Sequence, residues 1–340
     1  MPSEHLLATI RSLLAQPTAP FHEDAVRAEI LMQLAQCPHV AVQQDEFGNL
    51  VAHYRRGQEI ARYAFAAHMD HPAYVFDPAA TADGDESASP LLPVSPSPHL
   101  PLSTFLGWVP EEYRAARPPV RDFGTFAMWD LPACEVRDGR IHSRACDDLI
   151  GCAAIVAMFH ALEAEAAECA CYGLFTRAEE VGFIGAIRLA QSGLLPTDVT
   201  VVSLETSSEK APGAGKMGDG AIVRVGDRTS IFDPQETATL WQLAQEAKIP
   251  AQRCLMSGGS CEATAFQLYG YRSAALCVAL GNYHNCGPDT RIEPEFVALA
   301  DVEALVRLCL AAARAPEPPD PRVQLRQRLE ARIEEYRRFF

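Results

Sequence analysis

The sequence predicts a three-layer α/β/α protein with a mostly parallel central sheet and an inserted small β-rich subdomain. Short apolar runs, typical of strands buried on both faces of a parallel sheet, alternate with segments of helical pattern. This alternation is characteristic of α/β domains. The 340 residues, of which 48% are hydrophobic and 21% charged, are enough to form a sizeable core.

Four apolar runs each end in side chains that can bind a metal ion. These predicted strands lie within residues 62–70, 169–180, 199–205 and 273–284. Helices are predicted at residues 1–16, 149–166, 183–193, 233–247 and 321–340. Because the carboxyl ends of parallel strands open onto one crevice, we expect the four strand ends to lie close together.

One segment interrupts the alternation. It begins with "DPAATADGDESASPLLPVSPSPHLPLS", which is rich in Pro, Ser and Asp, and its end, "GTFAMWDLPACEVRDGRIHS", indicates short strands with turns. We therefore predict a discontinuous α/β domain of residues 1–76 and 140–340. Residues 77–139 are predicted to form an inserted β-rich flap or dimerisation subdomain.

Composition excludes several classes of partner. The formal net charge of -15 argues against nucleic acid and against an anionic membrane, since both need clustered Lys and Arg. The 11 cysteines form no CxxC pair, and several lie in apolar runs, as is usual in a reducing compartment. The first residues indicate an amphipathic helix, not a signal peptide, and no apolar run is long enough to span a bilayer. A cytoplasmic location is expected.

Two of the candidate site motifs have ordinary explanations when taken singly. His68 and Asp70 could be a ligating imidazole and the carboxylate that orients it, although a strand-end histidine followed by a turn is the commoner case. Asp147 and Asp148 precede a long helix, where Asp is a preferred N-cap. A carboxylate can also bridge two metal ions through its two oxygens, and a helix start would hold it rigidly.

The paired glutamates in "FTRAEEVGFIGA" are harder to explain as simple helix caps. Hydrolysis at a metal centre needs a ligand and a base that takes a proton from water, and Glu179 and Glu180 could supply both. Cations would relieve their mutual repulsion. Glu205 and His284 each end an apolar run of their own and complete the set. The joint pattern predicts a centre with two metal ions.

In this order these residues resemble the co-catalytic di-zinc exopeptidases of clan MH, and most closely the branch of glutamyl and tetrahedral aminopeptidases. The supporting stretches are "AHMDH", "CDDLIGCAA", "RAEEVGFIGA", "GDGAIVRVGD" and "SGGSCEATAFQLYGY", within a match from about residue 10 to 312. The resemblance implies that Asp147 bridges two divalent ions, zinc first and cobalt or manganese as alternatives. It implies that the remaining ligands are His68 and Glu205 for one ion, and Glu180 and His284 for the other.

The resemblance also implies an activity. Glu179 would be the general base that activates a metal-bridging hydroxide, Asp70 would orient His68, and the chain would be an aminopeptidase acting on short peptides as a dimer or larger homo-oligomer. At the position of Glu205 this branch usually has Asp, whereas a Glu there is seen in carboxypeptidase-like or acylase-like relatives. This difference leaves open a carboxypeptidase or an acylase of N-acyl amino acids. Such a site would need a cation for the substrate carboxylate, for which Arg291 is a candidate. A metal-free, non-catalytic binding subunit is the alternative from a different class.

Overall fold

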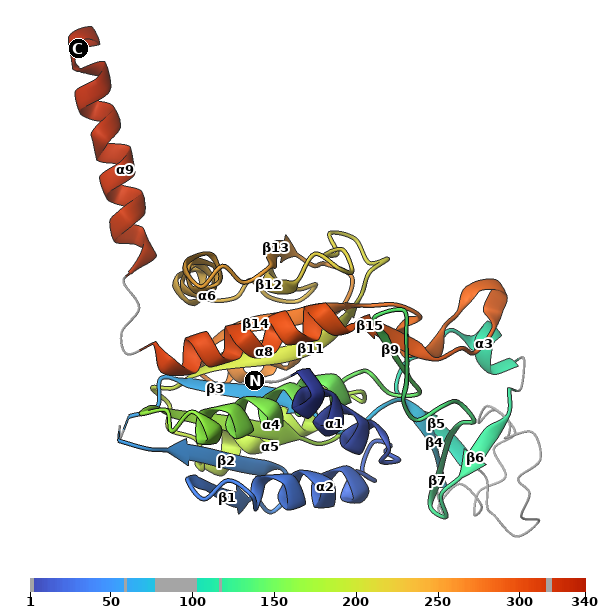
Figure 1. Cartoon of the computed structure of the whole chain (residues 1–340). Coiled ribbons are helices and arrows are strands. Elements are labelled where there is room, and N and C mark those ends of the chain that lie inside the picture. The colour runs from blue at the N-terminus through green and yellow to red at the C-terminus, as the bar shows by residue number, and fades with distance from the viewer. Residues whose placement is uncertain (1–2, 58–59, 77–102, 116–117, 316–319) are drawn as a thin grey trace.

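The computed structural model describes residues 3–57, 60–76, 103–115, 118–315 and 320–340. The Pro- and Ser-rich start of the predicted insertion, residues 77–102, lies outside this part of the chain. The main sheet has eight strands in the order β1-β2-β10-β3-β11-β14-β12-β13 (Figure 1). Its strands are β1 Val40–Gln44, β2 Leu50–Arg55, β3 Tyr63–His68, β10 Ala170–Thr176, β11 Thr200–Ser208, β12 Ala221–Gly226, β13 Ala251–Leu255 and β14 Arg272–Leu280.

The centre of this sheet is parallel, as expected. Strands β10, β3, β11 and β14 run in the same direction, whereas β2 joins one side and β12 the other in antiparallel pairing. The helices of the described chain are α1 Ser3–Leu14, α2 Asp24–Leu34, α3 Glu111–Ala115, α4 Leu149–Ala164, α5 Ile184–Ser192, α6 Pro234–Glu246, α7 Glu262–Leu268, α8 Leu299–Arg314 and α9 Pro321–Tyr336. The predicted helices therefore form, each within a few residues of its expected bounds.

Both faces of the sheet are covered, which confirms the three layers. In β3, Phe65 and Ala67 belong to the core cluster that contains α4 and α8, whereas Ala64 and Ala66 belong to the cluster that contains α5 and α7. Alternate side chains of a strand point to opposite faces, so this division places helices on both sides. Helix α4 is buried along nearly its whole length and packs against α1 and α8, as expected of a helix that is apolar on all sides.

Two small antiparallel sheets lie beside the main one. The first has the order β5-β4-β7-β6 and the second the order β15-β9-β8. Their strands are β4 Ala73–Phe76, β5 Ser103–Leu106, β6 Val120–Asp122, β7 Phe126–Trp129, β8 Glu135–Arg137, β9 Arg140–Ser143 and β15 Glu295–Ala298. Short strands thus form where the sequence indicated them. The division of the chain into domains at residues 77 and 139 stays a prediction.

The unequal lengths of neighbouring strands open the sheet at its carboxyl edge. Strand β11 pairs with β3 only as far as Ser203, opposite Ala66, but pairs with β14 up to Ser208, opposite Leu280. The strand therefore does not end at Glu205, as its apolar run suggested, but three residues later. Beyond Ser203 one edge of β11 is free of β3, and this leaves room for side chains to gather beside it.

The last helix, α9, projects away from the rest of the molecule (Figure 1). It forms where the sequence predicted a helix bearing both signs of charge. Within the described residues, no helix is long and apolar enough to cross a membrane.

Candidate metal centre

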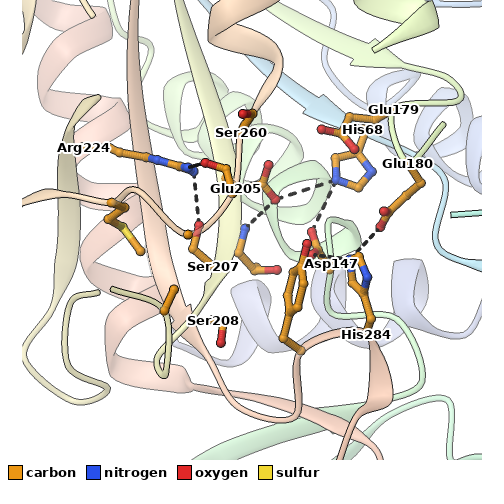
Figure 2. Close-up of a pocket in the computed structure, with 16 residues that line it drawn as sticks. His68, Asp147, Glu179, Glu180, Glu205, Ser207, Ser208, Arg224, Ser260 and His284 are labelled. Atoms are coloured by element: carbon orange, nitrogen blue, oxygen red, sulfur yellow. Dashed lines mark hydrogen bonds and ion pairs between the residues drawn. The ribbon is translucent and has the colours of Figure 1, made fainter. Parts of the chain in front are cut away.

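Five chain segments bring the predicted site residues together at the carboxyl edge of the main sheet (Figure 2). The residues are His68 at the end of β3, Asp147 between β9 and α4, Glu179 and Glu180 in the turn after β10, Glu205 in β11, and His284 in the turn after β14. All of them line one cavity. The expectation that these strand ends converge is therefore met, although Glu205 reaches the cavity from within its strand.

Asp147 lies between the two histidines. Its Oδ1 is 3.3 Å from His68 Nε2, and its Oδ2 is 3.6 Å from His284 Nε2. Its neighbour Asp148 has a different role, because the Asp148 carboxylate caps α4 by accepting a hydrogen bond from the Gly151 backbone N–H at 3.1 Å. The helix-cap explanation thus applies to Asp148, whereas Asp147 presents one oxygen to each histidine.

The remaining carboxylates divide between the two histidines. Glu205 Oε1 is 3.7 Å from His68 Nε2, and Glu180 Oε1 is 3.3 Å from His284 Nε2. The geometry of the ligand atoms permits a metal ion in the group His68, Asp147 and Glu205, and in the group Asp147, Glu180 and His284. Asp147 belongs to both groups. A third permitted group joins His68 with Glu179 and Glu180.

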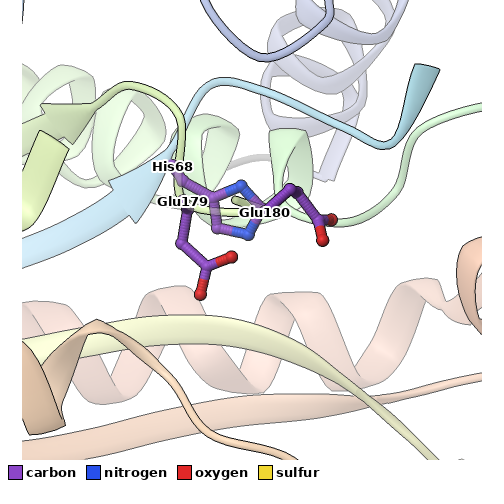
Figure 3. Close-up of side chains that lie close together, drawn as sticks. All are labelled: His68, Glu179 and Glu180. Carbon is purple, nitrogen blue, oxygen red and sulfur yellow. The ribbon is translucent and has the colours of Figure 1, made fainter. Parts of the chain in front are cut away.

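The paired glutamates stand in a turn, and the following helix α5 does not begin until Ile184. Figure 3 shows the side chains of Glu179 and Glu180 pointing in different directions near the ring of His68. The turn is fixed by Asp70, whose Oδ1 accepts the Glu179 N–H at 2.9 Å and whose Oδ2 accepts the Glu180 N–H at 3.1 Å. One buried carboxylate therefore sets the position of both glutamates.

Asp70 also lies beside His68. The Nδ1 atom of His68 is 3.1 Å from the backbone carbonyl oxygen of Asp70 and 3.5 Å from its Oδ1. A histidine that donates from one ring nitrogen to a carbonyl or carboxylate directs the other nitrogen towards a metal. For His284 the corresponding partner is the carbonyl oxygen of Trp108, a residue that follows β5 of the first small sheet.

The electrostatics of the site reflect an excess of carboxylates. Burial alone would lower the pKa of His68, but the charge of Glu179 and the contact with Asp147 raise it well above its ordinary value. Burial alone would raise the pKa of Asp147, but the two histidines outweigh this effect and lower it. Burial and the charge of Asp147 together raise the pKa of Glu205 to about 8. Divalent cations would relieve this crowding of negative charge.

Buried ligand atoms without a hydrogen bond indicate that the donor set fits a metal ion. Asp147 Oδ1, Glu180 Oε1 and His284 Nε2 are buried, and within the described part of the chain they make ion-pair contacts of 3.3 to 3.6 Å but no hydrogen bond of good geometry. Buried polar atoms are normally paired, so each such atom needs an explanation. Imidazole nitrogens and carboxylate oxygens are the usual protein ligands of catalytic Zn²⁺ besides thiolate.

The wall of the cavity holds a cation that the sequence did not single out. Arg224 of β12 is only 2% exposed, and it donates hydrogen bonds to Ser207 Oγ at 3.3 Å and to the Gly259 carbonyl at 3.0 Å. Arg291, by contrast, is not among the described residues that line the cavity, and it pairs with Glu293 at 3.3 Å. Sequence order could not reveal Arg224, because its strand joins the sheet beyond β14.

Two further buried residues next to the ligands were also missed. The ring of His71 contacts the Asp147 carbonyl at 2.7 Å and Asn285 Oδ1 at 3.1 Å. The carboxylate of Glu295 accepts backbone hydrogen bonds from both Asp147 and His284. The second His of "AHMDH" was a visible signal for the first residue. For Glu295 there was none, since its contacts are to backbone atoms of distant residues.

Known proteins resemble the chain in both sequence and fold. The model of the M42 glutamyl aminopeptidase family matches residues 120–308, more than half of the chain. A curated protein of Acetivibrio thermocellus, named "Putative aminopeptidase", is 28% identical over 192 residues, which are 53% of this chain and 54% of that protein. The chain thus matches about half the length of this relative.

Solved structures extend the likeness of fold over most of the chain. The TET1 peptidase of Pyrococcus horikoshii has a TM-score of 0.70 at 22% identity, covering 91% of this chain and 99% of its own. An aminopeptidase of Desulfurococcus kamchatkensis has a TM-score of 0.69 at 19% identity, with 93% and 96% covered. These identities establish the fold alone. Because the family model spans more than half of the sequence, the chain belongs to the M42 glutamyl aminopeptidase family.

Proposed function

We propose that the protein is a metal-dependent aminopeptidase that cleaves the terminal amide bond of short peptides with the help of two divalent ions. One observation carries the proposal: two ligand groups, each with one histidine and one glutamate, share the carboxylate of Asp147. Family membership supports a peptidase. Shared carboxylates suit pairs of metal ions that act together in hydrolysis.

Each predicted ligand has a place in this proposal. Asp147 would bind both ions, His68 and Glu205 would complete one site, and Glu180 and His284 would complete the other. Zinc suits a set of imidazoles and carboxylates, and cobalt or manganese could replace it. When bound, the ions would polarise the scissile carbonyl group and lower the pKa of the attacking water.

The residues of the chain would supply the proton transfers. Glu179 is buried, and burial together with the neighbouring carboxylates Glu205 and Glu180 raises its pKa well above the ordinary value despite the opposing charge of His68. A carboxylate with a raised pKa is a stronger base for taking a proton from water and a suitable acid for returning it to the leaving amine. Asp70 would hold Glu179 in place through the backbone hydrogen bond, and it would help to orient His68.

Strands β5, β6 and β7 are proposed to belong to the inserted flap or dimerisation subdomain of residues 77–139, with the α/β domain formed by residues 1–76 and 140–340. Strand β4, which pairs with β5 and β7, is the last strand of residues 1–76. The carbonyl of Trp108 contacts His284, so this part of the chain contributes to the site. We also propose a homo-oligomer of two or more subunits. A TET1 structure of the same fold is a dodecamer, which supports this proposal.

A carboxypeptidase or an N-acyl amino acid acylase on the same metal core is the second candidate. Two observations favour it: Glu205 replaces the usual Asp, and the buried cation Arg224 lines the cavity where a substrate carboxylate could bind. Arg291, which pairs with Glu293, is not needed for this role. A non-catalytic, metal-free binding subunit is the third candidate, and the buried ligand atoms that make no hydrogen bond in the described part of the chain weigh against it.

Peptide digestion distinguishes these candidates. The purified protein, loaded in turn with Zn²⁺, Co²⁺ and Mn²⁺, is incubated with a mixed-sequence peptide that is free at both ends and, separately, with N-acyl amino acids, and the products are followed by mass spectrometry. Stepwise loss of residues from the N-terminus is the expected result. Loss from the C-terminus would establish the carboxypeptidase, and hydrolysis of N-acyl amino acids alone would establish the acylase. A protein that binds no divalent ion and leaves every substrate intact would be the binding subunit.

A further inference from the structure

One buried carboxylate connects two of the proposed metal ligands through their backbones. Glu295 is fully buried at the start of β15. Its Oε2 accepts hydrogen bonds from the N–H groups of Cys146 and Asp147 at 2.8 and 3.0 Å, and its Oε1 accepts the N–H of His284 at 2.8 Å. The side chain therefore spans the short gap between two segments that are far apart in the sequence.

The strand that carries Glu295 lies between these two segments. On one side β15 pairs with β9, with Glu295 opposite Ser143, and β9 leads directly to Asp147. On the other side Gly281 and Phe296 exchange backbone hydrogen bonds of 2.9 and 3.2 Å just before His284. A Cβ on Gly281 would lie 2.1 Å from the Phe296 ring, so a larger residue there would have to displace this ring.

The geometry of the contact suits a carboxylate. Three N–H donors converge on Glu295, and an ionised carboxylate has acceptor sites on both oxygens. A glutamine of the same shape has only one acceptor oxygen, and its NH₂ group would meet an N–H donor on the other side. Loss of one acceptor would release either Asp147 or His284, because a buried N–H that is left without an acceptor destabilises the folded arrangement.

A second connection joins the same two segments. The His71 ring lies between the Asp147 carbonyl and the side chain of Asn285. Together, His71 and Glu295 contact both the N–H and the carbonyl of Asp147. Asp147 is thus fixed on both sides of its α-carbon, which leaves its side chain directed at the histidines.

We propose that Glu295 is a positioning residue that sets the spacing between Asp147 and His284, and thereby the affinity of the metal position that these two share with Glu180. The proposal rests on the metal-dependent function proposed above. Groups that hold metal ligands in place typically change metal affinity or activity by about 10–100-fold when they are replaced. The ion held by His68 and Glu205 depends on Glu295 only through Asp147 and would be affected less.

The test compares two buried glutamates. Glu295→Gln is the variant, and Glu236→Gln is the matched control, because Glu236 is equally buried but accepts hydrogen bonds from Tyr63 and Arg62 instead of from ligand segments. Each protein is freed of metal by chelation and titrated with Zn²⁺ against a competing chromophoric chelator. We expect at least one Zn²⁺ to bind about 10-fold or more weakly to Glu295→Gln. The affinity of Glu236→Gln should equal that of the unchanged protein.

Thermal unfolding of the metal-free proteins distinguishes a loss of Zn²⁺ affinity from a failure of the variant to fold. If Glu295→Gln is folded and binds two Zn²⁺ as tightly as the unchanged protein, the proposal is wrong. If that variant does not fold, Glu295→Asp, which keeps the charge but shortens the side chain, takes its place under the same criterion. An unchanged protein that binds no Zn²⁺ would instead overturn the proposed metal-dependent function. If the unchanged protein binds Zn²⁺ tightly and the variants bind it with the same affinity, only the proposed role of Glu295 would be overturned.

Discussion

The carboxylate of Asp70 holds the backbone of Glu179, with 2.9 Å between Oδ1 and the amide nitrogen. Its second oxygen accepts the N–H of the next residue, Glu180, at 3.1 Å. Because Asp70 also lies beside His68, one side chain links the end of β3 to the turn that follows β10. The relative position of a proposed ligand and of the proposed base therefore depends on a residue that need not touch substrate.

Asp70→Asn is expected to lower kcat about 10–100-fold. An amide has only one acceptor oxygen, so it could hold only one of the two N–H groups, and the turn that carries Glu179 and Glu180 would shift. The matched control is Asp301→Asn. Asp301 is buried and accepts two loop N–H groups, of Gly218 and Gly220, at 2.7 and 2.9 Å, and it is not among the residues that line the cavity. Steady-state kinetics with a peptide substrate would measure both variants. Equal losses of kcat in the two would contradict the positioning role of Asp70.

Replacing the two adjacent glutamates singly should separate catalysis from metal binding. Glu179→Gln is expected to keep its metal content and to lose about 10²–10⁴-fold in kcat, the usual contribution of a general base. Glu180→Gln should instead weaken metal binding, since Glu180 Oε1 faces His284. Elemental analysis of the dialysed proteins, together with kinetics, would measure both effects. Near-normal turnover by Glu179→Gln would mean that another group takes the proton.

The sequence was most informative where the rules of parallel sheets apply. Continuous apolar runs predicted strands that are buried on both faces, and the common edge of those strands predicted that His68 and His284 would meet. A local pattern could not show which of Asp147 and Asp148 faces the histidines and which caps α4, since either residue could cap the helix. The extension of β11 past Glu205 was also hidden, because it depends on pairing with β14 after β3 has ended.

The part of the site that was not predicted consists of contacts that produce no periodic pattern in the sequence. Glu295 acts on backbone N–H groups that any residue could supply, so no sequence pattern marks its partners. Arg224 belongs to β12, whose antiparallel placement beside β14 reverses the direction that the alternation of strands and helices suggests. Tertiary pairing, not local propensity, determines both positions.

Metal removal should destabilise the protein, and more so at higher pH. The pKa of Glu205 in the folded metal-free protein is raised from 4.5 to about 8 by burial and by the charge of Asp147, against the opposing effect of His68. The folded state therefore holds more protons than the unfolded chain between pH 4.5 and 8, so its stability falls as pH rises through this range. Bound metal favours the deprotonated ligands, and at a free concentration 100 times its Kd it adds about 2.7 kcal/mol.

Thermal unfolding of the metal-free and Zn²⁺-loaded proteins, measured at intervals from pH 5 to pH 8, would check this expectation. The difference between the two melting temperatures should widen as the pH increases. A variant such as Asp301→Asn, altered outside the site, should show the same widening. A difference that is constant or narrows would show that the carboxylates of the site do not hold the excess protons assigned to them.

Glu262→Gln is expected to stabilise the metal-free protein above pH 7. Glu262 is 1% exposed in the first turn of α7, and burial raises its pKa from 4.5 to about 7, although the charge of His68 lowers it. An unfolded chain ionises this group near pH 4.5, so the folded state loses stability between pH 4.5 and 7 and does not regain it at higher pH. A neutral amide of the same shape removes this loss, because the amide does not ionise in either state. Chemical denaturation at pH 5 and pH 8 would compare the free energies of unfolding. The free energy of unfolding of the variant should exceed that of the unchanged protein only at pH 8. If the two free energies differ by the same amount at pH 5 and pH 8, Glu262 stays ionised throughout.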